Sequence, residues 1–178
     1  MKQTSCLEMR IFIIGYMGAG KSTVGKRLAN RINMPFIDLD DVFEAKYRYS
    51  IPNFFDDFGE EKFHEFEHSC LKEIISENEH AVISTGGGTA CHHGNIDIMN
   101  KEGLTVYLKM HPSSLTKRLN MARRLRPVIR NVEGTDMRNF IEGQLSEREK
   151  FYNKATITVK GKSLDLDGLV ECPNISCL

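Results

Sequence analysis

The chain has 178 residues, of which 40% are hydrophobic and 27% are charged, as expected for one globular domain. Its 24 Lys and Arg residues balance its 24 Asp and Glu residues, so the formal net charge is zero. These values exclude collagen-like and low-complexity chains, and they argue against a protein that binds nucleic acid or a membrane through bulk positive charge.

Short apolar runs and unpaired cysteines indicate a cytoplasmic chain. The apolar run at residues 11–14 is far shorter than the roughly 20 residues of a membrane-spanning helix, and residues 1–9 lack the apolar core of a signal peptide. The five cysteines are odd in number and none form Cys-x-x-Cys, so neither a disulfide framework nor a zinc ribbon is predicted. We expect no membrane and no nucleic-acid partner.

Strands and helices are predicted to alternate along the chain. Apolar runs indicate strands at residues 10–15, 36–40, 81–85, 104–109 and 155–159. Helical spacing indicates helices at residues 22–32, 41–49, 60–77, 112–121 and 136–152. This alternation predicts an α/β fold, in which a five-stranded parallel sheet carries helices on both faces and binds ligands beyond the carboxyl ends of its strands.

The sharpest motif is a phosphate-binding loop at residues 15–22 (GYMGAGKS), which fits G-x-x-x-x-G-K-[ST]. Glycines in this pattern allow backbone N–H groups to surround a polyphosphate, and the following helix directs its positive end at the same anion. Lys21 would reach the β- and γ-phosphates, and Ser22 would ligate Mg²⁺. A dinucleotide fingerprint is disfavoured because Gly18 and Gly20 are followed by Thr23 in place of the third glycine.

A second motif, His64-Glu65-x-x-His68, satisfies the H-E-x-x-H pattern of zinc peptidases. On a helix the two imidazoles would share a face, with Glu65 as the general base. The alternative is a solvated acidic helix with incidental histidines, and spacing identifies no third ligand. We prefer the second interpretation and keep a zinc metallopeptidase as a remote alternative.

Several segments, in order over residues 10–159, resemble the shikimate kinase family. They are the loop at residues 18–23 (GAGKST), Asp38-Leu39-Asp40, Gly59-Glu60-Glu61-x-Phe63-x-x-x-Glu67, Gly86-Gly87-Gly88, Arg126-Pro127-Val128-Ile129 and Arg148-x-x-x-Tyr152-x-x-x-Ala155. The resemblance implies a single domain over residues 1–178 with the three-layer P-loop NTPase fold, and ATP-dependent phosphorylation of the 3-hydroxyl of shikimate in aromatic amino acid biosynthesis. It also implies substrate-binding helices at about 41–77 and a lid at about 117–135. Residues 1–9 are expected to form an N-terminal extension and residues 160–178 an irregular tail. We expect a monomer.

The same resemblance implies roles for individual residues. Catalysis is assigned to Lys21, Asp40 and Arg126. Nucleotide binding is assigned to Gly18, Ala19, Gly20, Lys21, Ser22, Thr23 and Arg126, and Mg²⁺ binding to Ser22 and Asp38. Shikimate binding is assigned to Asp40, His64, Gly86, Gly87, Gly88 and Arg148. Two simpler alternatives are a helix N-cap for Asp40 and a surface ion pair for Arg148.

One departure concerns the substrate carboxylate. The family has arginine where this chain has His64, and histidine cannot form the same two-donor fork. We expect His64 to keep a weaker, pH-dependent carboxylate contact, or Arg48 or Lys62 to compensate. The tail from residue 160 onward does not resemble the family. Alternatives are a gluconate or nucleoside kinase relative, or a regulatory ATP-binding module without transfer activity.

Charge is unevenly distributed along the chain. Residues 103–132 contain seven Lys and Arg and no acid, whereas residues 56–67 carry six Asp and Glu. Beside a phosphate loop, the basic segment is interpreted as a mobile cover for nucleotide phosphates.

Overall fold

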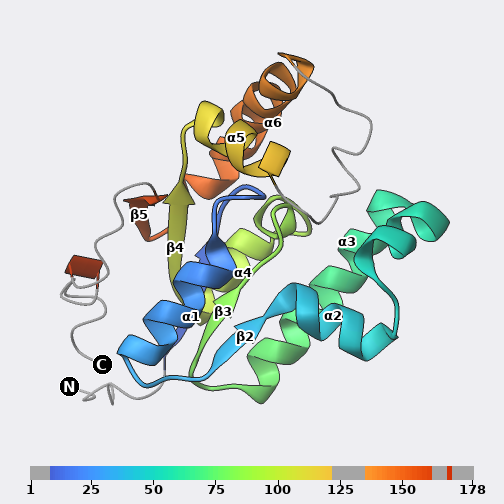
Figure 1. Cartoon of the computed structure of the whole chain (residues 1–178). Coiled ribbons are helices and arrows are strands. Elements are labelled where there is room, and N and C mark those ends of the chain that lie inside the picture. The colour runs from blue at the N-terminus through green and yellow to red at the C-terminus, as the bar shows by residue number, and fades with distance from the viewer. Residues whose placement is uncertain (1–8, 122–134, 162–167, 170–178) are drawn as a thin grey trace.

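A computed structural model describes residues 9–121, 135–161 and 168–169 of the chain. Five parallel strands form one sheet in the order β2-β3-β1-β4-β5 (Figure 1). The strands are β1 (Arg10–Ile14), β2 (Phe36–Asp38), β3 (Ala81–Ser84), β4 (Gly103–Lys109) and β5 (Ile157–Lys160). The predicted five-stranded parallel sheet is confirmed.

The central strand β1 is buried on both of its faces. Ile11, Phe12, Ile13 and Ile14 have no exposed surface, because β1 pairs with β3 on one side and β4 on the other while helices cover the sheet. Helix α1 (Lys21–Arg31) lies on one face and α4 (Asn95–Glu102) on the opposite face (Figure 1). Strands covered in this way have continuous apolar runs, which is the pattern that residues 11–14 show.

The remaining helices lie at the two sides of the sheet. They are α2 (Leu39–Tyr47), α3 (Ile51–Glu77), α5 (Pro112–Met121) and α6 (Thr135–Tyr152), with a short 3₁₀ turn, η1 (Thr89–Cys91). Helices α2 and α3 form a lobe on the β2 side of the sheet, and α5 and α6 stand on the β4 side (Figure 1). None of the helices in the described ranges has the length and apolar character needed to span a bilayer.

Most elements differ from their predicted bounds by one or two residues, α3 begins much earlier than predicted, and α4 is additional. Strand β2 ends at Asp38 and not at residue 40, because the Asp38 side chain accepts a hydrogen bond from the Asp40 amide and caps α2. Helix α3 begins at Ile51, where Ser50 is the N-cap and Pro52 fits the first turn. Helix α4 was not predicted, since its segment is short and contains Asn95, Asp97 and Asn100, which are weak helix formers.

Some predicted regions lie largely outside the described residues. The N-terminal extension (1–9) is described only at Met9, the lid (117–135) only at 117–121 and 135, and the tail (160–178) only at 160–161 and 168–169. Arg126 also lies outside the described residues.

Candidate active site

The loop between β1 and α1 has the backbone form that the phosphate-binding motif predicts. Gly15, Gly18 and Gly20 have φ values of 140°, 78° and 97°, a region that other residues rarely adopt. The loop therefore turns sharply before α1, and Gly20 serves as the N-cap of that helix. Lys21 is 9% exposed, and its Nζ donates to the Tyr16 carbonyl at 3.2 Å, which places the ammonium group within the loop.

An oxygen-rich cluster lies beside the first turn of α1. The Ser22 and Ser84 hydroxyl oxygens are 3.4 Å apart, and Ser84 is the register partner of Asp38 on the neighbouring strand β2. Hydroxyl and carboxylate oxygens are ligands that Mg²⁺ prefers, so the donor set fits the predicted cation. The sequence analysis did not identify Ser84, although its position at the end of a buried strand next to β1 is a usable signal.

Two cavities meet at the carboxyl edge of the sheet. We call the first the loop cavity; its lining residues are Met17, Gly18, Gly20, Lys21, Ser22, Thr23, Asp40, Thr85 and Gly87. We call the second the α3 cavity; its lining residues are Met17, Asp40, Ile51, Phe55, Glu60, Phe63, His64, Glu67, Gly86, Gly87, Gly88 and Arg148. Three residues, Met17, Asp40 and Gly87, line both cavities. Asp40 thus stands at the junction of the two cavities. The N-cap of α2 is Asp38, so the N-cap alternative for Asp40 is wrong.

The glycine run after β3 forms a close-fitting wall of the α3 cavity. A Cβ atom on Gly86 would lie 2.4 Å from Glu67 Oε1 and 3.3 Å from Asp40 Oδ1. A Cβ atom on Gly88 would lie 2.8 Å from His64 Cε1. Only the absence of side chains allows this backbone to approach α3 so closely. Two of the predicted glycine positions therefore have a direct steric reason.

Arg148 extends from α6 into the α3 cavity. Its Nη1 lies 3.5 Å from the Gly87 carbonyl oxygen, and its guanidinium stands 5.5 Å from the centre of the Tyr16 ring. The Tyr152 hydroxyl donates to the same carbonyl at 2.5 Å, so α6 is tied to the glycine run at two points. The surface-pair alternative for Arg148 is not supported, because the side chain lines the cavity.

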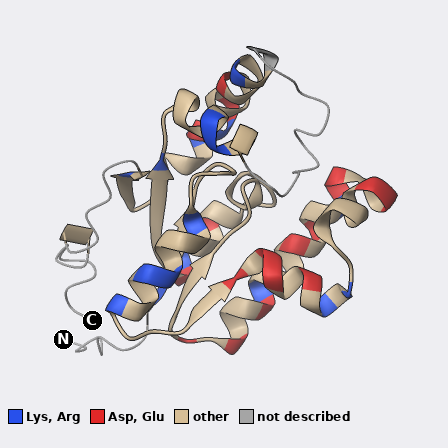
Figure 2. Cartoon of the chain, in the orientation of Figure 1, with Lys and Arg blue, Asp and Glu red and all other residues tan. Residues whose placement is uncertain are grey.

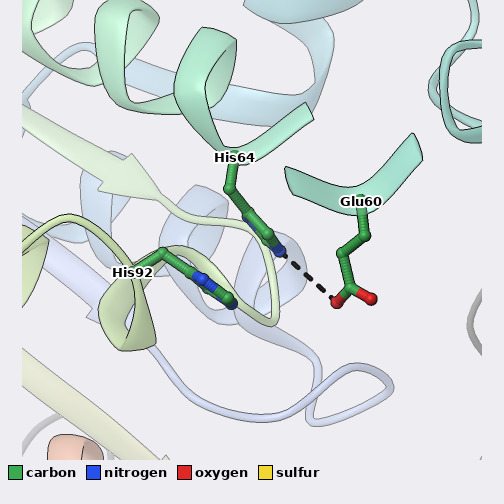
Figure 3. Close-up of side chains that lie close together, drawn as sticks. All are labelled: Glu60, His64 and His92. Carbon is green, nitrogen blue, oxygen red and sulfur yellow. Dashed lines mark ion pairs between the residues drawn. The ribbon is translucent and has the colours of Figure 1, made fainter. Parts of the chain in front are cut away.

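His64 is buried within a chain of polar contacts. The side chain is 5% exposed, and Nδ1 lies 2.9 Å from Glu67 Oε2. The other oxygen of Glu67 accepts a hydrogen bond from the Thr89 hydroxyl at 2.5 Å. The His64 ring stacks on His92 with centroids 3.6 Å apart and planes at 13° (Figure 3). Burial, and secondarily the neighbouring His64, lower the pKa of His92 to about 4, so the His92 ring is neutral near pH 7.

Neither of the residues expected to compensate for His64 lines the α3 cavity. Lys62 forms an ion pair with Glu65 on the exposed face of α3, and Arg48 is the C-cap of α2. The structure instead brings His92 to His64, a residue that the sequence analysis missed because no motif includes it. The H-E-x-x-H residues do not form a common metal site, because each of the three side chains has a different partner. His68 Nδ1 lies 2.6 Å from Asn95 Oδ1, and Glu65 pairs with Lys62 on the surface.

Charge is divided between the two sides of the site. Asp and Glu residues concentrate on α2 and α3, whereas Lys and Arg residues occupy α1 and α5 (Figure 2). From α5, Arg118 Nη1 donates to the Ala19 carbonyl at 3.0 Å, so the described part of the basic segment reaches the phosphate-binding loop. The sequence analysis counted Arg118 in the basic segment but gave it no role of its own.

Comparison with known proteins identifies the family. The family model described as shikimate kinase matches residues 17–170. A curated shikimate kinase from Azobacteroides pseudotrichonymphae is 44% identical over 162 residues, which is 91% of this chain and 95% of that protein. The chain belongs to the shikimate kinase family.

Solved structures of the family share this fold. A shikimate kinase from Bacteroides thetaiotaomicron superposes with a TM-score of 0.85 at 37% identity, covering 92% of this chain and 97% of that chain. A shikimate kinase from Acinetobacter baumannii, solved in complex with shikimate, superposes with a TM-score of 0.81 at 28% identity. That alignment covers 94% of this chain and 90% of that chain. The P-loop kinase fold implied by the sequence motifs is therefore confirmed, and ATP is the expected phosphoryl donor of the family.

Proposed function

We propose that this chain transfers the γ-phosphoryl group of ATP to the 3-hydroxyl of shikimate, giving shikimate 3-phosphate and ADP. The observation that carries this proposal is the meeting, at Asp40, of the loop cavity and the α3 cavity, which is lined by both polar and apolar side chains. A donor in the loop cavity and an acceptor in the α3 cavity would approach each other at this carboxylate. A regulatory ATP-binding module would need no such second cavity.

The nucleotide side of the reaction is assigned to the loop. The backbone from Gly18 to Thr23 would hold the β- and γ-phosphates, and Lys21 would exchange the Tyr16 carbonyl for phosphate oxygens. Ser22 and Asp38 would hold Mg²⁺, which when bound offsets negative charge on the polyphosphate. Arg118, beside the loop, would add positive charge near the phosphates. The resemblance assigns Arg126 of the lid to the transferring phosphoryl group.

The acceptor side is assigned to the α3 cavity. Arg148 supplies a planar fork for a carboxylate, and His64 with the glycine backbone supplies further polar contacts to a hydroxylated ring. Asp40 would accept the proton of the 3-hydroxyl group. At the same time the hydroxyl oxygen would bond to the γ-phosphorus, and the bond from that phosphorus to ADP would break. The departing ADP takes the electron pair of the broken bond.

The reaction is tested by ADP release from purified protein, with ATP and Mg²⁺, in parallel with shikimate, gluconate and nucleosides as acceptors. We expect turnover that depends on shikimate at several pH values. Turnover that depends on gluconate or on a nucleoside would replace the proposed acceptor, and release of ADP regardless of acceptor would contradict the transfer step.

The role of Asp40 is tested by Asp40→Asn. Asparagine is nearly isosteric but cannot take up the hydroxyl proton, so kcat should fall by about 10²–10⁴-fold. The shikimate KM should change much less. Asp41→Asn, at the next position on α2, is the matched control and should keep kcat near the wild-type value. A kcat within a factor of two of wild type for Asp40→Asn would contradict the base assignment.

We also propose that the chain acts as a cytoplasmic monomer on this small molecule, without nucleic-acid or membrane partners. The described cysteines, Cys70 and Cys91, are free thiols, which suits a reducing compartment. The zero net charge gives no bulk attraction to polyanions. Mass measurement in solution would test the monomer.

A further inference from the structure

Each ring nitrogen of His64 faces a carboxylate. Nδ1 lies 2.9 Å from Glu67 Oε2, and a carboxylate oxygen only accepts hydrogen bonds, so Nδ1 carries the hydrogen. In the neutral ring, Nε2 then presents a lone pair. That nitrogen lies 3.6 Å from Glu60 Oε1, which is a second acceptor. Two acceptors at this separation repel each other unless a cation, either a proton or a metal ion, lies between them.

His92 adds a third donor to the same space. One ligand atom from each of Glu60, His64 and His92 lies within 4.8 Å of the other two. The His64 and His92 rings are stacked face to face, and both extend toward the Glu60 carboxylate (Figure 3). A neutral imidazole has one ring nitrogen without hydrogen, and its lone pair is a metal ligand. Among the described residues, this is the group of His, Cys, Asp and Glu side chains that is arranged to hold a metal ion.

The separation of the three ligand atoms is close to that of a zinc site, but the stacked His64 and His92 rings hold their nitrogen lone pairs nearly parallel, so the His92 ring must turn out of the stack to share an ion with His64. Tetrahedral Zn²⁺ with bonds of about 2.0–2.1 Å holds its ligand atoms about 3.3 Å apart. Glu60 is 53% exposed and His92 is only partly buried, so both can shift toward a cation. His64, in contrast, is fixed by its buried contacts. One coordination position would remain open toward the α3 cavity.

The second layer of contacts also has the form found around metal-bound histidines. A ligating imidazole commonly donates its other N–H to a carboxylate, which orients the ring and raises its basicity. Here Glu67 receives that hydrogen bond and is itself held by the Thr89 hydroxyl. Glu67 is 1% exposed and Thr89 is fully buried, so this support exists before any ion binds.

We infer that His64, His92 and Glu60 form a binding site for a divalent transition-metal ion of the zinc type, oriented by Glu67 and Thr89. The site shares only His64 with the H-E-x-x-H motif. It is distinct from the Mg²⁺ position at Ser22 and Asp38, whose oxygen donors suit a harder cation. The inference does not rest on the proposed kinase reaction, because it concerns the chain without nucleotide or acceptor.

The test is a titration of the full-length, chelator-treated protein with Zn²⁺ against a chromophoric competitor, without ATP or shikimate. We expect one Zn²⁺ per chain. His92→Phe keeps a ring that can stack on His64 but removes the nitrogen donor. Loss of an outer-shell hydrogen bond weakens metal binding by roughly 10–100-fold, and loss of a direct ligand in His92→Phe should weaken it further. Glu60→Gln, at an exposed position, should also weaken binding. Thr89→Val should weaken it by about 10–100-fold.

Two control variants distinguish this site from other possible zinc sites on the chain. His93→Phe makes the same change at the next, exposed residue and should leave the affinity unchanged. His68→Asn should also bind zinc normally, whereas a zinc-peptidase site would lose it. Co²⁺ in place of Zn²⁺ should give the visible absorption of a four-coordinate site in the wild type and lose it in His92→Phe. Absence of zinc binding in the wild type, or equal affinity in wild type and His92→Phe, would overturn the inference. Thermal unfolding of each variant confirms that it folds.

Discussion

At the residue scale, the α3 cavity depends on a buried polar chain from Thr89 through Glu67 to His64. Each member is held by the next, at 2.5 Å and 2.9 Å, and a buried carboxylate without these partners would be costly. His64 therefore presents a fixed edge to the cavity. It lacks, however, the two-donor fork that an arginine would offer to a carboxylate.

This difference predicts the effect of His64→Arg. Arginine can still donate to Glu67 and would add a permanent positive charge facing the acceptor, so the shikimate KM should fall by about tenfold, the effect of one charge-assisted hydrogen bond. Steady-state kinetics at fixed, saturating ATP provides the measurement, and kcat should change little.

The matched control is Lys62→Arg, which places a guanidinium on the exposed face of the same helix, where Lys62 pairs with Glu65. Its KM should equal that of the wild type. An unchanged or higher KM for His64→Arg would count against the placement of the carboxylate beside His64.

At the element scale, the bend in α3 shapes the acceptor cavity. Gly59 has φ 83° and ψ 171°, which interrupts the helix between two straight segments. Ile51 and Phe55 line the cavity from the segment before the bend, whereas Glu60, His64 and others line it from the segment after the bend. A continuous helix could not present both sets of residues in this arrangement.

The bend predicts opposite effects for two glycine substitutions. A Cβ atom would meet nothing within 4 Å at either Gly59 or Gly143, so the backbone conformation decides the result. Gly59→Ala forces a side chain into a region that is essentially glycine-only and should destabilise the fold by about 1–3 kcal/mol. Gly143→Ala lies within α6 and should stabilise it by about 0.5–1 kcal/mol.

Urea unfolding at equilibrium measures both free energies of unfolding. Gly59→Ala should also raise the shikimate KM, because the cavity wall moves, whereas Gly143→Ala should not. Equal changes in stability for the two variants would show that the bend is not a constraint.

At the scale of the whole molecule, the α2–α3 lobe carries an aromatic core of its own beside the sheet. Phe43 is 1% exposed, and its ring contacts those of Tyr47, Phe54 and Phe63 at centroid distances of 4.9–5.1 Å. The lobe is acidic on its surface, while basic side chains occupy α1 and α5 (Figure 2). The neutral total charge is therefore the sum of two local charges of opposite sign.

The aromatic core predicts a large effect for Phe43→Ala. Removing a buried ring leaves a cavity in the lobe and should lower the free energy of unfolding by about 3–5 kcal/mol. Phe58→Ala is the matched control, because Phe58 belongs to the same aromatic group but is 55% exposed, and it should cost less than about 1 kcal/mol. Chemical denaturation of both variants checks this, and similar losses would show that the lobe has no separate core.

Much of the fold and the phosphate-binding loop could be predicted from the sequence, because those features depend on local chemistry. The apolar run at residues 11–14 requires burial on both faces, and the glycines of residues 15–20 permit backbone angles that other residues avoid. Local patterns were weaker for α4, a short helix whose N-cap Gly94 makes no side-chain capping hydrogen bond. They were also weaker for the start of α3, where Ser50 caps the helix.

The acceptor cavity required the tertiary structure. His64 and His92 are 28 residues apart (92 − 64), and nothing local indicates that their rings stack; the closeness of α3 to the segment after β3 brings them together. The same packing turns His68 toward Asn95 and leaves Glu65 on the surface, which separates the members of the H-E-x-x-H motif. Sequence patterns specify which chemical groups a chain carries and how each segment bends. The contacts between segments distant in the sequence place those groups around a common space, because burial of apolar surface selects one packing of the helices on the sheet.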